Sequence, residues 1–331
     1  MDKISVISSF LYEILLWNIP LLYGTVGEIL VEKSGSLNLG VEGTMAVGSL
    51  VGFLVGSFTY SMGIGVLAAF VAGMLCGLLF SLLTVTLKAN QNITGLMLTT
   101  FGLGLFFFVA NGMKNSGSWP GIEASTKVLE GFKDVSIPLL SDIPVIGPSL
   151  FNQNALVYLG VAIAVAVWWY LKYTSLGLKL RSIGENPGAA DSAGINVNRM
   201  KYIHICVGSG IMAIGGFYLA LVQNCSFSSS DWIGGYGWIA VALVIFAKWN
   251  PLLAVGGTVV FGFFNTLQVK AGSLASAFPG VLGWLRDIPS EFYKALPFIV
   301  TAVVLIVTSI RSKKGGGAPA ALGLAYFREE R

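Results

Sequence analysis

The length of the segments without a charged side chain constrains this chain most. No Asp, Glu, Lys or Arg occurs between Glu42 and Lys88, or between Asp142 and Lys172. Each interval exceeds the roughly 20 residues that a helix needs to cross about 30 Å of hydrocarbon. A helix satisfies its own backbone hydrogen bonds in lipid, and the alternation typical of barrel strands is absent. The sequence therefore predicts an all-α polytopic membrane protein.

Composition agrees with this fold class, because 55% of the residues are hydrophobic and only 11% are charged. A soluble domain carries about a quarter charged residues. We expect a transmembrane domain at 1–311 and a cytoplasmic tail at 312–331. The segment 233–248 is short for a span, so a partial or re-entrant helix is an alternative there. The nine expected spans are 10–31, 40–59, 64–87, 92–113, 154–173, 201–222, 233–248, 251–271 and 293–311.

Basic residues predict the orientation, since cytoplasmic loops of membrane proteins carry an excess of Lys and Arg. Most of the 20 basic residues fall on one side if the C-terminus and the loop at 174–199 are cytoplasmic. Nine spans then place the N-terminus outside. This asymmetry accounts for the net charge of +4, so we expect no nucleic-acid partner.

A short segment in the loop at 174–199 has signals for both ends of a helix. Asn186 precedes Pro187, which is the pattern of an N-cap followed by proline at the first helical position. Gly194 can adopt the left-handed conformation that ends a helix. The sequence predicts a two-turn cytoplasmic helix within about 183–196. Its small side chains suit insertion into a groove of a partner, and a plain connecting loop is the alternative.

The segment Ser34–Gly43 places polar residues and glycines where a helix would otherwise continue through the inner membrane region. Irregular backbone is tolerated at that depth only where it faces protein or a wet cavity. Asn38 and Glu42 therefore either line a polar pathway through the membrane or clamp neighbouring helices.

Other polar residues in or near the spans offer a surface for a solute. Asn265 and Gln268 share a helical face and suit hydrogen-bond recognition of a neutral polar molecule. Asn92 can instead cap the helix that begins near residue 91. The expected pathway residues are Asn38, Glu42, Gln91, Asn92, Thr94, Thr99, Asn265 and Gln268.

Several functional classes lack their motifs in the sequence. No G-x-x-x-x-G-K-[ST] run occurs, so the chain cannot hold a nucleoside triphosphate in a P-loop. No metal-ligand spacing and no catalytic cluster stand out, and we expect neither an enzyme nor a metal site. If transport is driven by ATP, the hydrolysing subunit is a separate protein.

The stretch 181–196 resembles the coupling helix of ABC importer permeases in the simple-sugar, nucleoside and branched-chain amino-acid family, which is ribose-permease-like. Ser34–Gly43, Gly237–Pro251 and the tail Pro319–Glu329 are similar to nucleoside-type members that act as the second permease. The likeness runs from about residue 20 to the end. It implies that the ATPase-coupling residues are Gly184, Glu185, Asn186, Pro187, Gly188, Ala189, Ala190, Asp191, Ala193 and Gly194.

The resemblance implies a type II ABC importer permease-like fold and ATP-driven import of a nucleoside or related small polar solute by alternating access. ATP and Mg would bind a partner ATPase, with no cofactor in this chain. The other implied partners are a second permease, in a heterodimer, and an extracytoplasmic substrate-binding protein or lipoprotein, at a bacterial inner membrane. Riboflavin or a simple sugar is an alternative solute. An ion-coupled secondary transporter is a different class, with Glu13, Glu28 and His204 as candidates for its ion site.

Overall fold

The structure of the chain is a computed structural model. It describes residues 3–136, 146–223, 232–289 and 317–327, and isolated positions between these ranges (138, 141, 143, 225, 291–293, 295, 296, 299, 300, 302, 303 and 306). The elements are α1 (Lys3–Glu32), α2 (Val41–Thr59), α3 (Met62–Ser81), a π-helical turn (Leu82–Thr86), α4 (Gln91–Asn115), α5 (Ile122–Glu130), β1 (Asp134–Ser136), α6 (Ile146–Leu150), β2 (Asn152–Asn154), α7 (Ala155–Tyr173), α8 (Ser175–Glu185), α9 (Pro187–Ser192), α10 (Val197–Val222), α11 (Tyr236–Phe246), α12 (Pro251–Ala277), α13 (Pro279–Leu282) and a 3₁₀ helix (Gly283–Asp287).

Within the described residues, seven helices are long and apolar enough to cross a membrane. They correspond to seven of the nine expected spans, and the polytopic helical fold is confirmed. The expected span at 233–248 contains only α11, whose 11 residues extend about 16 Å and cannot cross the hydrocarbon alone. The last expected span, 293–311, lies mostly outside the described residues, so the count of nine stays a prediction.

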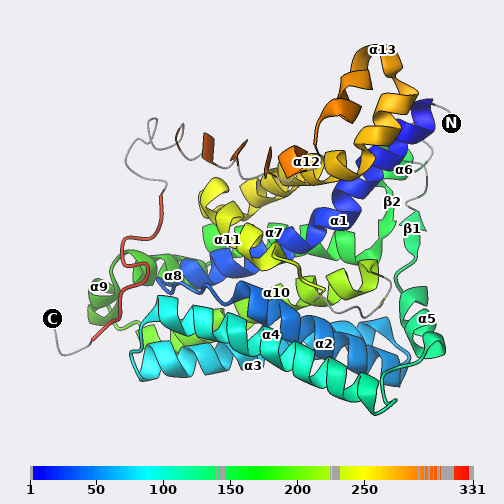
Figure 1. Cartoon of the computed structure of the whole chain (residues 1–331). Coiled ribbons are helices and arrows are strands. Elements are labelled where there is room, and N and C mark those ends of the chain that lie inside the picture. The colour runs from blue at the N-terminus through cyan, green and yellow to red at the C-terminus, as the bar shows by residue number, and fades with distance from the viewer. Residues whose placement is uncertain are drawn as a thin grey trace.

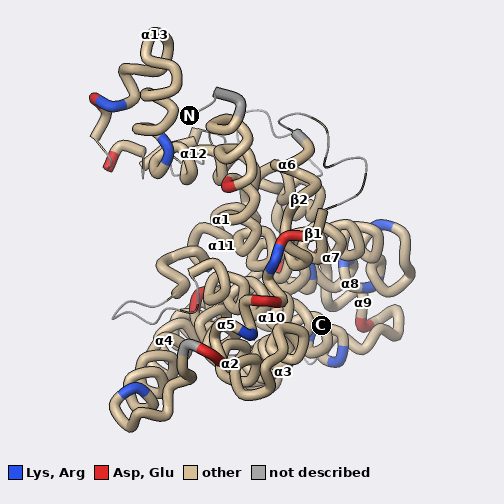
Figure 2. Tube along the Cα trace, turned by 90° about the vertical axis from the view of Figure 1, so that its right-hand side faces the viewer, with Lys and Arg blue, Asp and Glu red and all other residues tan. Residues whose placement is uncertain are grey.

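The long helices run side by side, and α10 lies at the centre of the bundle, against α1, α2 and α3 (Figure 1). Inside their apolar segments 83% of α1 and 89% of α10 are buried, against 33% of α7 and of α12. The helices α7 and α12 therefore present most of their apolar surface to lipid or to another subunit. Figure 2, turned by 90°, shows how few charged residues the helices carry.

Close packing in the centre of the bundle depends on residues without a side chain. A Cβ atom on Gly216 of α10 would lie 1.9 Å from the carbonyl oxygen of Met45 in α2. A Cβ atom on Gly43 of α2 would lie 2.3 Å from the carbonyl oxygen of Leu98 in α4. Small residues let membrane helices approach closely, because dispersion contacts replace the hydrophobic effect as the driving force in lipid. The backbones of α2, α4 and α10 are thereby held in direct contact.

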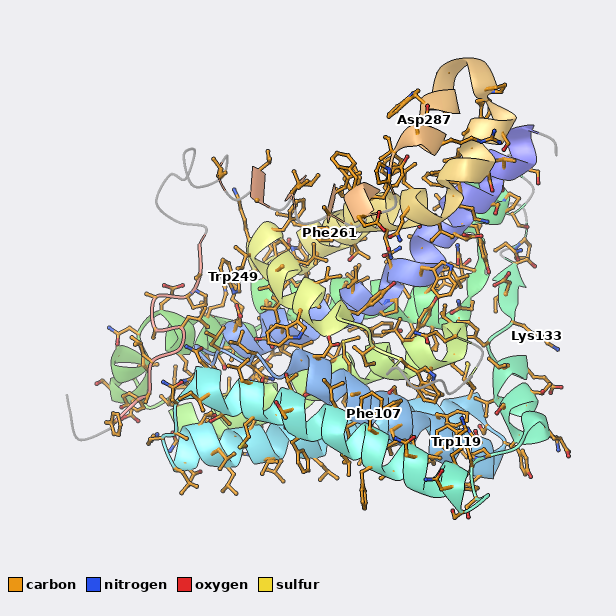
Figure 3. All side chains as sticks on the ribbon, viewed as in Figure 1. Phe107, Trp119, Lys133, Trp249, Phe261 and Asp287 are labelled. Carbon is orange, nitrogen blue, oxygen red and sulfur yellow. The ribbon has the colours of Figure 1, made fainter. Side chains whose placement is uncertain are left out.

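The bundle has two distinct ends. The helices α8 and α9 and residues 317–327 lie at one end, here called the α9 end (Figure 1). The N-terminal residues, α5, the β1–β2 pair and α13 lie at the opposite end, the α5 end. Trp249 lies toward the α9 end, Asp287 and Lys133 lie at the α5 end, and Phe261 lies between them (Figure 3). Positions along the bundle can therefore be judged as depths in a membrane.

Candidate functional site

The short helix α9 has the two end signals expected from the sequence. The side-chain oxygen of Asn186 accepts a hydrogen bond from the backbone N–H of Ala189 at 3.0 Å, and Pro187 opens α9. Gly194 has φ +80°, the left-handed conformation that favours glycine. Ala190 is buried, whereas Ala189 and Ala193 are exposed. The short helix thus presents small side chains outward at the α9 end, with its backbone conformation fixed at both ends.

The segment between α1 and α2 turns back from the α9 end into the bundle. Its polar residues Ser34, Ser36 and Asn38 are almost completely buried. Thr99 donates a hydrogen bond to the carbonyl oxygen of Leu39 at 3.1 Å. Because Thr99 lies eight residues after the first residue of α4, Leu39 lies about 12 Å along that helix from its start. The irregular backbone faces protein at this depth, which is one of the two conditions under which it is tolerated.

Side chains from two helices satisfy the backbone of this segment. The Gln91 side-chain oxygen accepts a hydrogen bond from the N–H of Leu37 at 2.7 Å. The Glu28 carboxylate accepts one from the N–H of Asn38 at 3.1 Å. Asn38 uses its own side-chain oxygen to accept from the N–H of Gly40 at 2.9 Å. A buried N–H without a partner costs about 1–3 kcal/mol, so these acceptors fix the path of the chain.

The Glu42 carboxylate caps the short helix α11. One of its oxygens accepts from the N–H of Gly235 at 2.7 Å, and the other accepts from the N–H of Gly237 at 2.6 Å. Glu42 is 4% exposed and is the second residue of α2, just after the irregular segment. Unpaired N–H groups and the helix dipole make a helix N-terminus positive, and a carboxylate compensates that charge. Glu42 therefore fixes where α11 starts and neutralises its positive end.

A pocket of about 340 Å³ opens beside this capped helix end. It lies between α1, α11 and α12, and Phe261, one of its lining residues, is located midway along the bundle (Figure 3). The Asn265 amide donates to the Asn18 side-chain oxygen at 3.0 Å and to the Tyr236 hydroxyl at 3.1 Å. Amides and aromatic rings thus line one cavity. The residues around it are Asn18, Leu21, Gly234, Gly235, Tyr236, Trp238, Ile239, Phe261, Asn265, Gln268 and Tyr293.

The structure divides the expected pathway residues into two groups. Asn265 and Gln268 line the pocket together. Asn38, Glu42, Gln91 and Thr99 are buried and hydrogen-bond to backbone within the chain, which is the clamping alternative for Asn38 and Glu42. Thr94 is also buried, and its hydroxyl donates a hydrogen bond to the carbonyl oxygen of Asn90, one helical turn earlier.

Asn92 belongs to neither group, because its side chain is exposed on the surface of α4. The alternative that Asn92 caps this helix is wrong. The side chain of Asn90 accepts from the N–H of Ile93 at 3.1 Å, so the helix begins one residue earlier than expected and its cap lies two residues earlier.

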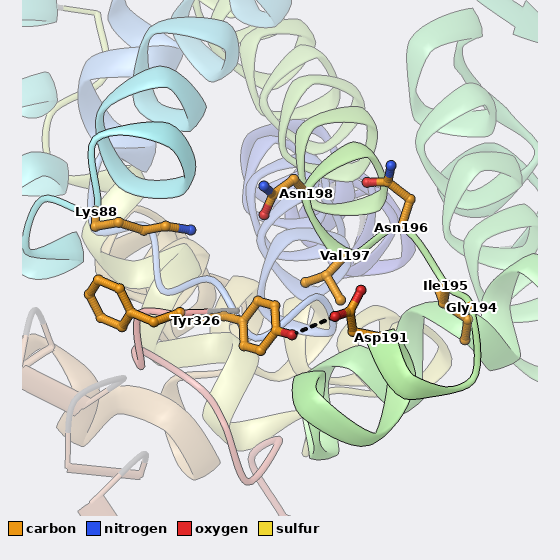
Figure 4. A pocket seen from close by; sticks show the side chains of 9 residues that line it. Lys88, Asp191, Gly194, Ile195, Asn196, Val197, Asn198 and Tyr326 are labelled. Atoms are coloured by element: carbon orange, nitrogen blue, oxygen red, sulfur yellow. Dashed lines mark hydrogen bonds between the residues drawn. The ribbon is translucent and has the colours of Figure 1, made fainter. Parts of the chain in front are cut away.

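Residues 317–327 form a folded segment at the α9 end, here called the tail segment, which the sequence did not indicate. Tyr326 reaches Asp191 of α9, and a cavity of about 550 Å³ remains between them and the start of α10 (Figure 4). Five hydrogen bonds join the tail segment to the rest of the chain: Ala320 N–H to Glu185 Oε2 at 3.4 Å, Ala321 N–H to Gly184 O at 2.9 Å, Gly323 N–H to Gly35 O at 3.2 Å, the Gln91 amide to Leu324 O at 3.4 Å, and Tyr326 OH to Asp191 Oδ2 at 2.9 Å.

The α9 end also carries a basic cavity of about 570 Å³, lined by Lys33, Arg181 and Lys248 from three separate parts of the chain. Glu185 lies in the same wall. Burial lowers the pKa of the Lys33 ammonium, and the negative charge of Glu185 partly offsets this effect. Three basic side chains and one acidic side chain therefore line this cavity.

The candidates for an ion site are occupied by contacts within the chain. Glu13 forms an ion pair with Lys270 at 2.7 Å. His204 contacts the Tyr170 hydroxyl and the carbonyl oxygen of Met200, each at 2.7 Å. Glu28 is fully buried and lies 15 residues after Glu13 on α1, about 22 Å along that helix. The three residues do not form one cluster among the described residues, and no group of three or more His, Cys, Asp or Glu suited to a metal occurs there.

Replacing Glu42 with Gln should loosen the start of α11, because the amide keeps one acceptor and turns a donor toward the second N–H. We expect the free energy of unfolding to fall by about 1.5–3 kcal/mol, the range for a hydrogen bond to a charged group. Amide hydrogen exchange should accelerate at residues 235–239 in the purified protein. Glu123→Gln is the control, because that side chain is 83% exposed on α5. Unchanged exchange at 235–239 in Glu42→Gln would show that the cap does not hold α11.

Comparison with known proteins places these features in a family. Residues 10–307 match the family described as the permease component of the branched-chain amino acid transport system. No solved structure matches the chain. A putative glucose ABC transporter permease of Haloferax volcanii is 34% identical, over 93% of this chain and 94% of that protein.

Two bacterial relatives are similar over their whole length. A guanosine ABC transporter permease of Bacillus subtilis is 32% identical, and a nucleoside ABC transporter permease of Lactococcus lactis is 31% identical, each over 100% of both chains. Permeases of this kind are transport subunits, and the ATPase is a separate chain. Together with the seven long helices, the match shows that this chain is a multi-pass membrane protein of the family of branched-chain amino acid transport system permease components.

Proposed function

We propose that the chain is the permease subunit of an ATP-driven importer for a nucleoside or a related small, neutral, polar solute, and that it works by alternating access. The pocket at the capped end of α11 carries this proposal. A helix that begins midway along a bundle directs its N–H groups into the protein interior, and transporters use such helix ends to hold solutes. The described residues place one such helix beside a cavity of suitable chemistry.

The charge at the pocket favours a neutral solute. An open helix N-terminus attracts anions, such as phosphates and carboxylates. Here the Glu42 carboxylate already accepts from Gly235 and Gly237, so an anionic solute would meet a negative charge in place of free N–H groups. Nucleotides and the carboxylate end of an amino acid are therefore poor candidates. A nucleoside or a sugar carries no charge and avoids this repulsion.

The side chains that line the pocket suit a base and a sugar together. The amides of Asn265 and Gln268 offer both donors and acceptors for hydroxyl groups and base edges. Tyr236 and Trp238 offer aromatic faces on which a planar base can stack. The relatives named for guanosine and for nucleosides match the whole chain. The relative named for glucose keeps a simple sugar as the second candidate, since the amides alone suffice for hydroxyl groups.

The rest of the chain suits partners on both sides of the membrane. We assign α9 as the coupling helix that inserts into a separate ATPase, which binds ATP and Mg. The basic cavity at the α9 end supports its placement in the cytoplasm, together with the C-terminus, under the positive-inside rule. The pocket is bordered by α11 and by the largely uncovered α12, which supports a pathway shared with a second permease, a different chain. An extracytoplasmic binding protein or lipoprotein delivers the solute, at the inner membrane of a bacterium.

Uptake competition tests the proposed solute class. The complete transporter in its host membrane should take up labelled uridine or guanosine. Unlabelled nucleosides should compete, whereas the nucleoside 5′-monophosphates and leucine should not, because each carries a carboxylate or phosphate. Asn265→Leu should weaken uptake about tenfold, since it removes a partly buried amide that a polar solute needs and leaves its partners unpaired. Competition by glucose alone would favour the sugar candidate, and competition by monophosphates would contradict the role of Glu42.

Coupling to an ATPase is tested separately at α9. Ala189→Arg places a long charged side chain on the exposed face of the helix without disturbing its buried residue, Ala190. We expect uptake and co-purification of the ATPase to be lost while the amount of permease in the membrane is unchanged. Asn115→Arg, at the exposed end of α4 at the α5 end, is the matched control and should have no effect. Normal uptake by Ala189→Arg would exclude α9 as the docking element.

A further inference from the structure

The tail segment joins parts of the chain that are far apart in sequence. It contacts α8 and α9 through Gly184 and Asp191, the irregular segment through Gly35, and α4 through Gln91. It is packed as well as hydrogen-bonded, since Ala321 is 7% exposed and a Cβ atom on Gly184 would lie 3.2 Å from Pro319. Gly323 has φ +78°, so the segment turns there between its contact with α8 and its contact with α4.

The helix α9 has few other attachments to the bundle. Its main contacts with other helices are to α8 and α10. The buried cluster beneath it comprises Ile183, Ala190 and Val197, and Tyr326 of the tail segment packs against that cluster. The Tyr326 hydroxyl then donates to Asp191 at 2.9 Å (Figure 4). The tail segment therefore connects α9 to the segment that follows α1, beside the close packing of Gly184 of α8 against Lys33.

From that segment the contacts continue to the pocket. Gly35 accepts from Gly323 of the tail, and Leu37 is fixed by Gln91, which also donates to Leu324 of the tail. Five residues after Leu37, the Glu42 carboxylate caps α11 at the edge of the pocket. The segment 34–42 is short, largely buried and hydrogen-bonded to the surrounding protein. A displacement of Gly35 must therefore move Glu42 or break these hydrogen bonds.

We propose that the tail segment is a strap that transmits the movement of α9 to the irregular segment and, through Glu42, to α11 and the pocket. Tyr326 is its positioning residue, because its ring packs on the cluster beneath α9 and its hydroxyl holds Asp191. The inference rests on the proposed function, in which a partner ATPase moves α9. It assigns a role in coupling to residues that touch neither the solute nor the pocket.

The test uses the complete transporter, reconstituted in lipid vesicles with its ATPase and its binding protein. Tyr326→Phe removes only the hydroxyl and keeps the ring. We expect the solute imported per ATP hydrolysed to fall about fivefold, the factor that corresponds to one net hydrogen bond. ATPase co-purification and ATP hydrolysis should stay at the wild-type level. Tyr173→Phe is the matched control, because the Tyr173 hydroxyl makes no hydrogen bond with the described residues and its ring is exposed at the end of α7.

A truncation that ends at residue 316 gives a stronger version of the same test. It should hydrolyse ATP without net import, and added peptide of residues 317–331 should restore part of the import. An unchanged ratio of import to hydrolysis in both variants would overturn the strap, as would a loss of import explained entirely by less protein in the vesicles. A wild-type transporter whose import does not need ATP would instead overturn the proposed function, whatever the variants do.

Discussion

The burial of irregular backbone in the bundle is the constraint on which the rest of the structure depends. Lipid and packed helices offer no water to the N–H and C=O groups of the segment after α1, so side chains must replace it. Glu28, Gln91 and Thr99 do so from α1 and α4. These contacts fix the depth at which α2 begins. They thereby set the position of Glu42, the first acidic residue of α2.

The pocket follows from the position of Glu42. A carboxylate held at this depth stabilises a helix N-terminus in the interior, so α11 can begin inside the bundle and end near the α9 end. The same carboxylate compensates the charge of that helix end and leaves amides and aromatic rings to face the cavity. The Glu42 carboxylate thus accounts both for the start of α11 inside the bundle and for the preference for a neutral solute. The tail segment adds a connection from this arrangement to α9.

Local patterns predicted the features that depend on neighbours in sequence. Long apolar runs predicted the seven long helices, and Asn186, Pro187 and Gly194 predicted both ends of α9. The N-cap of α4 was misplaced, because Asn90 and Asn92 are both plausible caps and the choice depends on how the preceding turn packs. The sequence showed that the segment at 233–248 is short for a span, but it did not show that Glu42 caps the helix within it.

The contacts that define the candidate site join residues distant in sequence, and no periodicity encodes them. Glu42 and Gly235 are 193 residues apart, and Tyr326 and Asp191 are 135 residues apart. Asn18 lies in an apolar helix. Its place beside the pocket is visible only in the structure, where Asn265 of α12 donates a hydrogen bond to it. Likeness to a family suggested that the segments at 34–43, 237–251 and 319–329 belong to one kind of protein. The structure adds that the described parts of these segments contact one another through Glu42 and Gly35.

Photolabelling is the most direct test of the claim that the solute occupies the pocket at the capped end of α11. An azido-substituted nucleoside would be irradiated with the complete transporter, and the labelled residues would be identified by mass spectrometry. We predict labels at residues 234–239 of the α11 start and at 261–268 of α12, lost when unlabelled nucleoside is added but retained with its monophosphate. Specific labelling confined to other helices, such as the apolar groove between α2, α3 and α4, would contradict this account.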